Sequence, residues 1–78
     1  MAKPVTIPLI NPNEPDALLI ALHVKEGQRL AAGDLIATLE TTKSTADIFA
    51  ESAGFVSGLC CQTGQTVRAG EVLCYLIE

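Results

Sequence analysis

The sequence contains an internal repeat, and this repeat limits the possible folds more than any other feature. When the chain is shifted by 37 positions, segment 24–39 aligns with segment 61–76. Both segments contain the pattern G-Q-x-x-x-A-G, with similar residues at the positions in between. Turn glycines recur in many β proteins, but that explanation does not account for the matched glutamine and alanine. The repeat therefore predicts two equivalent units within one small fold.

Each copy is interpreted as strands, because short runs of Leu, Ile, Val, Thr and Cys are interrupted by Gly, Pro and Asn. No window shows a capped apolar stripe with a 3.6-residue period, so no helix is predicted. Strands are expected near 5–10, 18–24, 35–41, 44–49, 55–61 and 72–77, with short extended pieces near 29–30 and 66–67.

The expected fold is all-β. It is a flattened β-barrel or sandwich of two four-stranded antiparallel sheets, related by an internal pseudo-two-fold axis, and each sheet covers the apolar face of the other. Strand alternation predicts that Leu22 and Val24 face inward, together with their repeat counterparts Leu59 and Cys61. His23 and Cys60 are then expected to face outward.

Length and charge exclude several classes of protein. The 78 residues suit a single domain, 1–78. The net charge of −4 argues against a nucleic-acid partner, which requires a basic surface. The longest apolar run, 17–22, is far shorter than the roughly 20 residues of a membrane-spanning helix, so no membrane partner is expected. Without a secretion signal in the sequence, the expected location is the cytoplasm, or an organelle matrix if the domain is excised from a larger protein.

The three cysteines are Cys60, Cys61 and Cys74. Two are adjacent and their number is odd, so the sequence predicts neither a disulfide framework nor a metal site. We expect reduced cysteines that act as small hydrophobic residues of strands. A catalytic Cys–His pair with His23 remains an alternative, although no local motif supports it.

The link between the two copies, 41–43, has no counterpart, because the chain ends at Glu78. Thr42 and Lys43 are expected at the bend of a hairpin, where Asn-Gly or Asp-Gly is usual. This departure from the usual turn residues suggests that the hairpin bend has a functional role. The alternative is a lysine that protects a strand edge from aggregation. A primary amine on a stiff, protruding hairpin is accessible to an enzyme that forms an amide with it.

Together these residues resemble the lipoyl domains of 2-oxoacid dehydrogenase complexes, within the biotinyl/lipoyl attachment family. The resemblance covers nearly the whole chain, notably segments 24–27, 32–34, 39–44 and 61–64. It implies that lipoate is amide-linked to Lys43, which lies in a Glu-x-x-Lys context. It also implies that the lipoate-attaching enzyme reads the surrounding positions Glu40, Thr42, Ser44, Gly27 and Gly54. The chain departs from the family at Thr42, where many lipoyl domains carry Asp, and at His23.

The resemblance implies a carrier domain with no catalytic residues of its own. The lipoyl group on Lys43 acts as a swinging arm. It accepts an acyl group from a thiamin-diphosphate-dependent decarboxylase, delivers it to coenzyme A at an acyltransferase core, and is reoxidised by a flavin-dependent dihydrolipoyl dehydrogenase. The isolated domain is expected to be monomeric. Glu40, Asp47 and Glu51 are candidates to steer basic partners, although Asp47 and Glu51 fit a role in solubility better. By the same resemblance, the loop 11–16 lies beside the hairpin and helps partners to discriminate.

Three alternatives stay open. A biotin carrier shares the fold and the lysine, but that branch typically places methionines beside the lysine. Here the neighbours are Thr42 and Ser44, and Met1 is the sole methionine. A glycine-cleavage carrier shares the chemistry but is usually longer. An unmodified interaction module, or a small enzyme that uses a Cys–His pair, is the third alternative.

Overall fold

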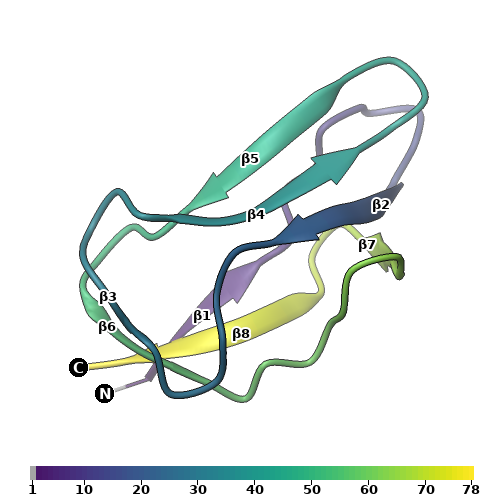
Figure 1. The fold of residues 1–78 in the computed structure, drawn as a ribbon. Coiled ribbons are helices and arrows are strands. Elements are labelled where there is room, and N and C mark those ends of the chain that lie inside the picture. The colour runs from purple at the N-terminus through teal and green to yellow at the C-terminus, as the bar shows by residue number, and fades with distance from the viewer. Residues whose placement is uncertain (1) are drawn as a thin grey trace.

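The computed structural model describes residues 2–78 and contains eight strands (Figure 1). Their bounds are β1 (Ala2–Thr6), β2 (Asp16–Leu22), β3 (Arg29–Leu30), β4 (Leu35–Glu40), β5 (Thr45–Phe49), β6 (Gly54–Ser57), β7 (Thr66–Arg68) and β8 (Val72–Ile77). They form two antiparallel sheets with strand orders β1-β8-β6-β3 and β5-β4-β2-β7. The all-β prediction is confirmed as a flattened sandwich whose sheets do not close into a barrel. Within residues 2–78, no helix has the length and apolar character needed to cross a membrane.

The two sheets are equivalent, as the repeat predicts. Each strand of one sheet has an equivalent in the other: β1 corresponds to β5, β8 to β4, β6 to β2, and β3 to β7. Each sheet therefore contains two strands from the first half of the chain and two from the second half. Because the halves are interleaved, neither half forms a complete sheet without the other.

The residues that match in the repeat make matching contacts in the turns. The side-chain oxygen of Gln28 accepts the N–H of residue 25 at 3.0 Å, and that of Gln65 accepts the N–H of residue 62 at 3.1 Å. Gly27 and Gly64 have φ angles of 84° and 92°, which glycine adopts at little cost. The glutamine and the glycine together stabilise one tight turn, and this explains why both recur at the same spacing.

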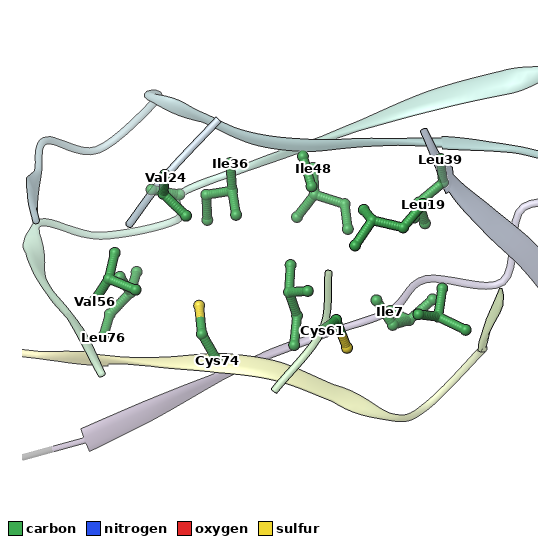
Figure 2. Packing of buried hydrophobic residues seen from close by; sticks show 14 of the residues in the cluster. Ile7, Leu19, Val24, Ile36, Leu39, Ile48, Val56, Cys61, Cys74 and Leu76 are labelled. Carbon is green, nitrogen blue, oxygen red and sulfur yellow. The ribbon is translucent and has the colours of Figure 1, made fainter. Parts of the chain in front are cut away.

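Mainly aliphatic side chains from both sides meet in the space between the sheets (Figure 2). Leu19, Ile36, Leu39 and Leu73 are completely buried there. Truncating one of these leucines to alanine typically costs about 2–5 kcal/mol. The predicted alternation of inward and outward residues is confirmed. Val24 and Cys61 are buried, and Leu22 and Leu59 pack against the core. The two residues expected to face outward, His23 and Cys60, are exposed.

Several predicted strand ends were wrong. The first strand ends at Thr6 and not near 10, since Pro8 has no N–H to donate to a ladder. The sixth ends at Ser57 and not near 61, because Gly58 turns the chain with a φ of 64°. Glu26 then accepts the N–H groups of Gly58 and Leu59 at 3.0 and 2.9 Å, which removes both donors from any ladder.

Smaller differences affect three further strands. The second strand, predicted at 18–24, covers Asp16–Leu22, because Asp16 pairs with Arg68 of β7. Ser44 was predicted to begin a strand but belongs to the turn before β5, and the strand predicted to end at 41 ends at Glu40. The strand predicted at 72–77 is confirmed, and the short pieces near 29–30 and 66–67 are confirmed as β3 and β7.

One insertion breaks the two-fold symmetry. Ile7 and Ala50 have equivalent places: the N–H of Ile7 bonds the Glu71 carbonyl, as that of Ala50 bonds Asp34. These residues are 43 positions apart, whereas equivalent residues farther along the chain are 37 apart. The first half therefore has six extra residues, which lie in the β1–β2 loop (residues 7–15).

Candidate functional site

The hairpin between β4 and β5 ends in the tip turn, residues 41–44. Its last strand pair is Glu40 with Thr45, and the chain bends at Thr42 and Lys43 as predicted. The tip turn lies at the opposite end of the molecule from the two chain ends (Figure 1). The side chain of Lys43 is exposed, and it has no ion-pair partner among residues 2–78. Its amine is therefore free to react with a group approaching from solvent.

Thr41 holds the tip turn from within the hairpin. It is 8% exposed, and its N–H donates to the Ser44 carbonyl at 2.8 Å. Its hydroxyl accepts the N–H groups of Lys43 and Ser44 at 3.4 and 3.2 Å. The same hydroxyl lies 3.2 Å from the Ser44 carbonyl, to which it donates. These contacts supply the turn with hydrogen bonds that a Gly-containing turn makes through its backbone, so no residue from 41 to 44 needs a positive φ.

Glu14 of the β1–β2 loop holds the tip turn from outside the hairpin. Its Oε2 accepts the Thr42 hydroxyl at 2.8 Å and the Thr42 N–H at 3.1 Å. The prediction that this loop lies beside the hairpin is thus confirmed by direct contact. An open groove next to the turn is lined by three carboxylates, those of Glu14, Asp16 and Glu40. The surface around the exposed lysine is therefore acidic.

The structure brings together only part of the predicted set of residues. Glu40, Thr42 and Ser44 surround Lys43 in the hairpin. Gly54 lies elsewhere, packed against the backbone of Ile77 near the C-terminal end of the chain. Gly27 lies in the turn before β3, and its N–H bonds the carbonyl of Val56 in β6, the strand that pairs with β3. Both glycines have backbone roles at these places, and their recognition by an attaching enzyme stays a prediction.

The other acidic candidates and His23 have ordinary surface roles. The carboxylate of Asp47 accepts the Thr38 hydroxyl at 2.8 Å across the β4–β5 pair. The His23 Nε2 lies 3.4 Å from the same hydroxyl. Glu51 follows the end of β5 that is farther from the tip turn. Of the three carboxylates named from sequence as steering groups, Glu40 is the one that borders the turn.

Cys74 of β8 is a small hydrophobic residue of a strand, as expected, whereas Cys61 is buried outside the strands and Cys60 is exposed. None of the three supports a Cys–His pair. Cys61 and Cys74 are buried, and burial raises the pKa of both thiols, that of Cys74 to about 11. The exposed Cys60 thiol donates to the Gly58 carbonyl at 2.9 Å. The contact of the His23 ring, in residues 2–78, is with Thr38 and not with a thiol.

Two residues of the site were missed from sequence. Thr41 is the first residue of the segment that links the two copies, and a hydroxyl residue just before a two-residue bend is a signal for a side-chain-capped turn. Glu14 carries no comparable signal, because its contact with Thr42 spans 28 positions and depends on how the loop folds.

Comparisons with known proteins agree with this geometry. A family model described as "Biotin-requiring enzyme", which covers biotin and lipoyl attachment domains, matches residues 3–76. The chain is 28% identical over 75 residues to the dihydrolipoyllysine-residue acetyltransferase component of the mitochondrial pyruvate dehydrogenase complex of Caenorhabditis elegans. It is 30% identical over 78 residues to the dihydrolipoyllysine-residue succinyltransferase component of the 2-oxoglutarate dehydrogenase complex of Azotobacter vinelandii.

These matches cover 95% and 100% of this chain, but the chain spans only 15% and 20% of the two relatives. The similarity is therefore to one domain of each larger protein. Among solved structures, the lipoyl domain of the 2-oxoglutarate dehydrogenase complex of Azotobacter vinelandii aligns with a TM-score of 0.80 at 28% identity. That alignment covers 96% of this chain and 95% of the solved domain. The family model matches nearly the whole of this chain, and the chain has the fold and the hairpin that the family implies. This chain therefore belongs to the biotinyl/lipoyl attachment family and is a lipoyl domain.

Proposed function

We propose that this domain carries lipoate on Lys43 and presents it as a swinging arm to the components of a 2-oxoacid dehydrogenase-type complex. The observation that carries the proposal is the exposed Lys43 side chain in a turn whose backbone N–H groups are all bound. A fixed backbone with a free amine suits a covalent tether, because an enzyme can enclose the lysine without unfolding the hairpin.

The residues of the tip turn fit this group. An amide bond at Lys43 removes the charge of the amine and breaks no ion pair, since none forms there within residues 2–78. A dithiolane attached at Lys43 would supply a disulfide for the transfer of acyl groups and electrons. The protein itself contributes a rigid base at Thr41, an open path around Lys43 and an acidic surrounding at Glu14 and Glu40.

We propose that the partners are a lipoate-attaching enzyme, a thiamin-diphosphate-dependent decarboxylase, an acyltransferase core and dihydrolipoyl dehydrogenase. The domain itself performs no catalysis in this scheme and acts as a monomer in the cytoplasm or an organelle matrix. Carboxylates beside the exposed lysine favour partners with basic surfaces, because complementary charge increases the rate of encounter. The names of the relatives place their own chains in pyruvate and 2-oxoglutarate dehydrogenase complexes, and this supports the assignment of such partners.

Biotin is the second candidate for the attached group, because the matching family model is described by biotin-requiring enzymes. The flanking residues favour lipoate, since Thr42 and Ser44 stand where biotin carriers typically have methionine. The two relatives described above support the same choice, because both are named as dihydrolipoyllysine-residue acyltransferase components.

The test is the intact mass of the protein after coexpression with a lipoate-protein ligase and lipoate. We expect a gain of one lipoyl group in the wild type and in Lys25→Ala, an exposed turn lysine that serves as the matched control. Lys43→Ala should show no gain. Coexpression with a biotin ligase, followed by streptavidin blotting, should give no signal. An unchanged mass under an active ligase, or a gain retained in Lys43→Ala, would refute the proposal.

A further inference from the structure

The two places where this chain departs from its two-fold symmetry lie against each other. One is the tip turn, which has the two chain ends as its symmetry equivalent. The other is the β1–β2 loop, residues 7–15, which is longer than its counterpart between β5 and β6, residues 50–53. Figure 1 shows this loop next to the β4–β5 hairpin. The hydrogen bonds between Glu14 and Thr42 join the two.

Glu14 is itself held in place on both sides. Its N–H donates to the Asn11 carbonyl at 2.9 Å, and the Asn11 side chain accepts the Asn13 N–H at 3.1 Å. Two positions later, the carboxylate of Asp16 accepts a hydrogen bond from Arg68 Nε of β7 at 3.0 Å. The loop is therefore tied to the sheet at one end and folded into a compact turn at the other. A carboxylate on such a loop has a defined position.

Glu14 completes the hydrogen bonding of the tip turn. The Thr41 hydroxyl accepts the N–H groups of Lys43 and Ser44, and the Glu14 carboxylate accepts the N–H of Thr42. The Thr41 contacts lie within the hairpin, so they fix the shape of the turn. The Glu14 contact comes from another segment of the chain, so it fixes the direction of the turn relative to the body of the domain. Hydrogen bonds to an ionised acceptor are stronger than neutral ones.

We propose that Glu14 is a positioning residue for Lys43: by binding Thr42, it sets the direction in which the lysine is presented to the enzymes that act on it. This inference rests on the proposed function and deepens it. It also explains the choice of Thr at position 42. The hydroxyl donates to Glu14 at 2.8 Å, whereas an aspartate there would put two carboxylates in contact and would push the loop away from the turn.

The test uses the 78-residue chain with the variants Glu14→Ala, Glu14→Gln and Thr42→Val. Glu51→Ala is the matched control, because it removes the same charge from an exposed site away from the tip turn. Backbone ¹⁵N relaxation of the unmodified domain reports order at residues 42–44. Steady-state kinetics of lipoate attachment then separate KM for the domain from kcat.

We expect Glu14→Ala to lower the order parameters of Thr42 and Lys43 from about 0.85 to below about 0.6. KM should rise about tenfold while kcat changes less than about twofold, because the unmodified turn must be ordered on binding. Thr42→Val should show part of this effect. Glu14→Gln should remain near the wild type, since its amide oxygen can take the place of Oε2 and accept both the Thr42 hydroxyl and the Thr42 N–H.

Unchanged order parameters in Glu14→Ala would overturn the inference, whatever the enzyme kinetics. Lower order parameters with unchanged KM would also overturn it, because the contact would then be structural only. A wild-type domain that accepts no lipoate under an active ligase would contradict the proposed function instead. The relaxation data would still decide whether Glu14 orders the turn.

Discussion

Gly54 lies directly against the backbone of Ile77, so closely that a Cβ atom added at position 54 would stand 3.0 Å from the Ile77 carbonyl oxygen. The equivalent place in the other sheet is Ala17, whose methyl group is accommodated and buried. The two sheets therefore differ in how closely their strands pack at this one point.

Gly54→Ala should lower the free energy of unfolding by about 1–3 kcal/mol, because the neighbour in the clash is backbone and cannot rotate away. Urea denaturation checks this value. In Ala17→Gly, the matched control, the loss should be about 1 kcal/mol, from backbone entropy and a lost methyl contact. A Gly54→Ala protein as stable as the wild type would show that the C-terminal strand gives way at no cost.

Thr41→Val should loosen the tip turn without unfolding the domain. The substitution keeps the shape of the side chain but leaves the N–H groups of Lys43 and Ser44 without their acceptor. A lost hydrogen bond of this kind costs about 1 kcal/mol, so amide exchange of Ser44 should accelerate several-fold. Hydrogen exchange by NMR measures this directly. Thr41→Ser, which keeps the hydroxyl, should exchange at close to the wild-type rate, and equal rates in all three proteins would contradict the capping role.

Alkaline pH should destabilise the domain through Cys74. Burial raises the pKa of its thiol from 9.0 to about 11, so the folded state binds this proton more tightly than the unfolded state. The resulting stabilisation is fully present below pH 9 and is lost as the pH rises towards about 11. The two-unit shift corresponds to about 3 kcal/mol.

Urea denaturation in reducing buffer, at about pH 8 and about pH 10.5, tests this dependence. The comparison is with Cys74→Ala, which separates the contribution of this thiol from that of the rest of the protein. That variant is less stable at both values, but its stability should fall less between them. Parallel loss in the two proteins would assign the alkaline effect to other groups.

Thiol labelling should separate the cysteines by position. Cys60 is exposed, whereas Cys61 and Cys74 are buried in the core. A water-soluble thiol reagent should therefore modify about one thiol per native chain rapidly, and all three after unfolding. Cys60→Ser should abolish the rapid phase. A rapid phase that survives in this variant would mean that the core opens at Cys61.

The repeat was enough to predict the fold, because equivalent residues of the two copies have the same local structural role. Gln28 and Gln65 cap equivalent turns, and the alternation around Val24 and Cys61 identifies the buried face in both copies. Strand ends were predicted less well, since they depend on distant side chains. The clearest case is Glu26, which ends β6 by taking two N–H groups from 32 and 33 positions away.

The candidate site was predictable in part for the same reason. Lys43 could be selected because the tip turn is the one link that the repeat does not duplicate. Thr41 acts within three residues, so a local rule could have identified it. Glu14 could not have been found in this way, because nothing in the loop sequence states which part of the hairpin the loop will contact.

The pairing of Ala2 with Ile77 places both chain ends on neighbouring strands, at the end of the sandwich opposite the tip turn. Any polypeptide joined to either end would leave the domain from the face turned away from Lys43. A fusion partner, an affinity tag or a surface anchor added at either terminus would thus leave the lysine unobstructed. The 35 Å long body of the domain would then act as a rigid spacer between that anchor and the reactive arm.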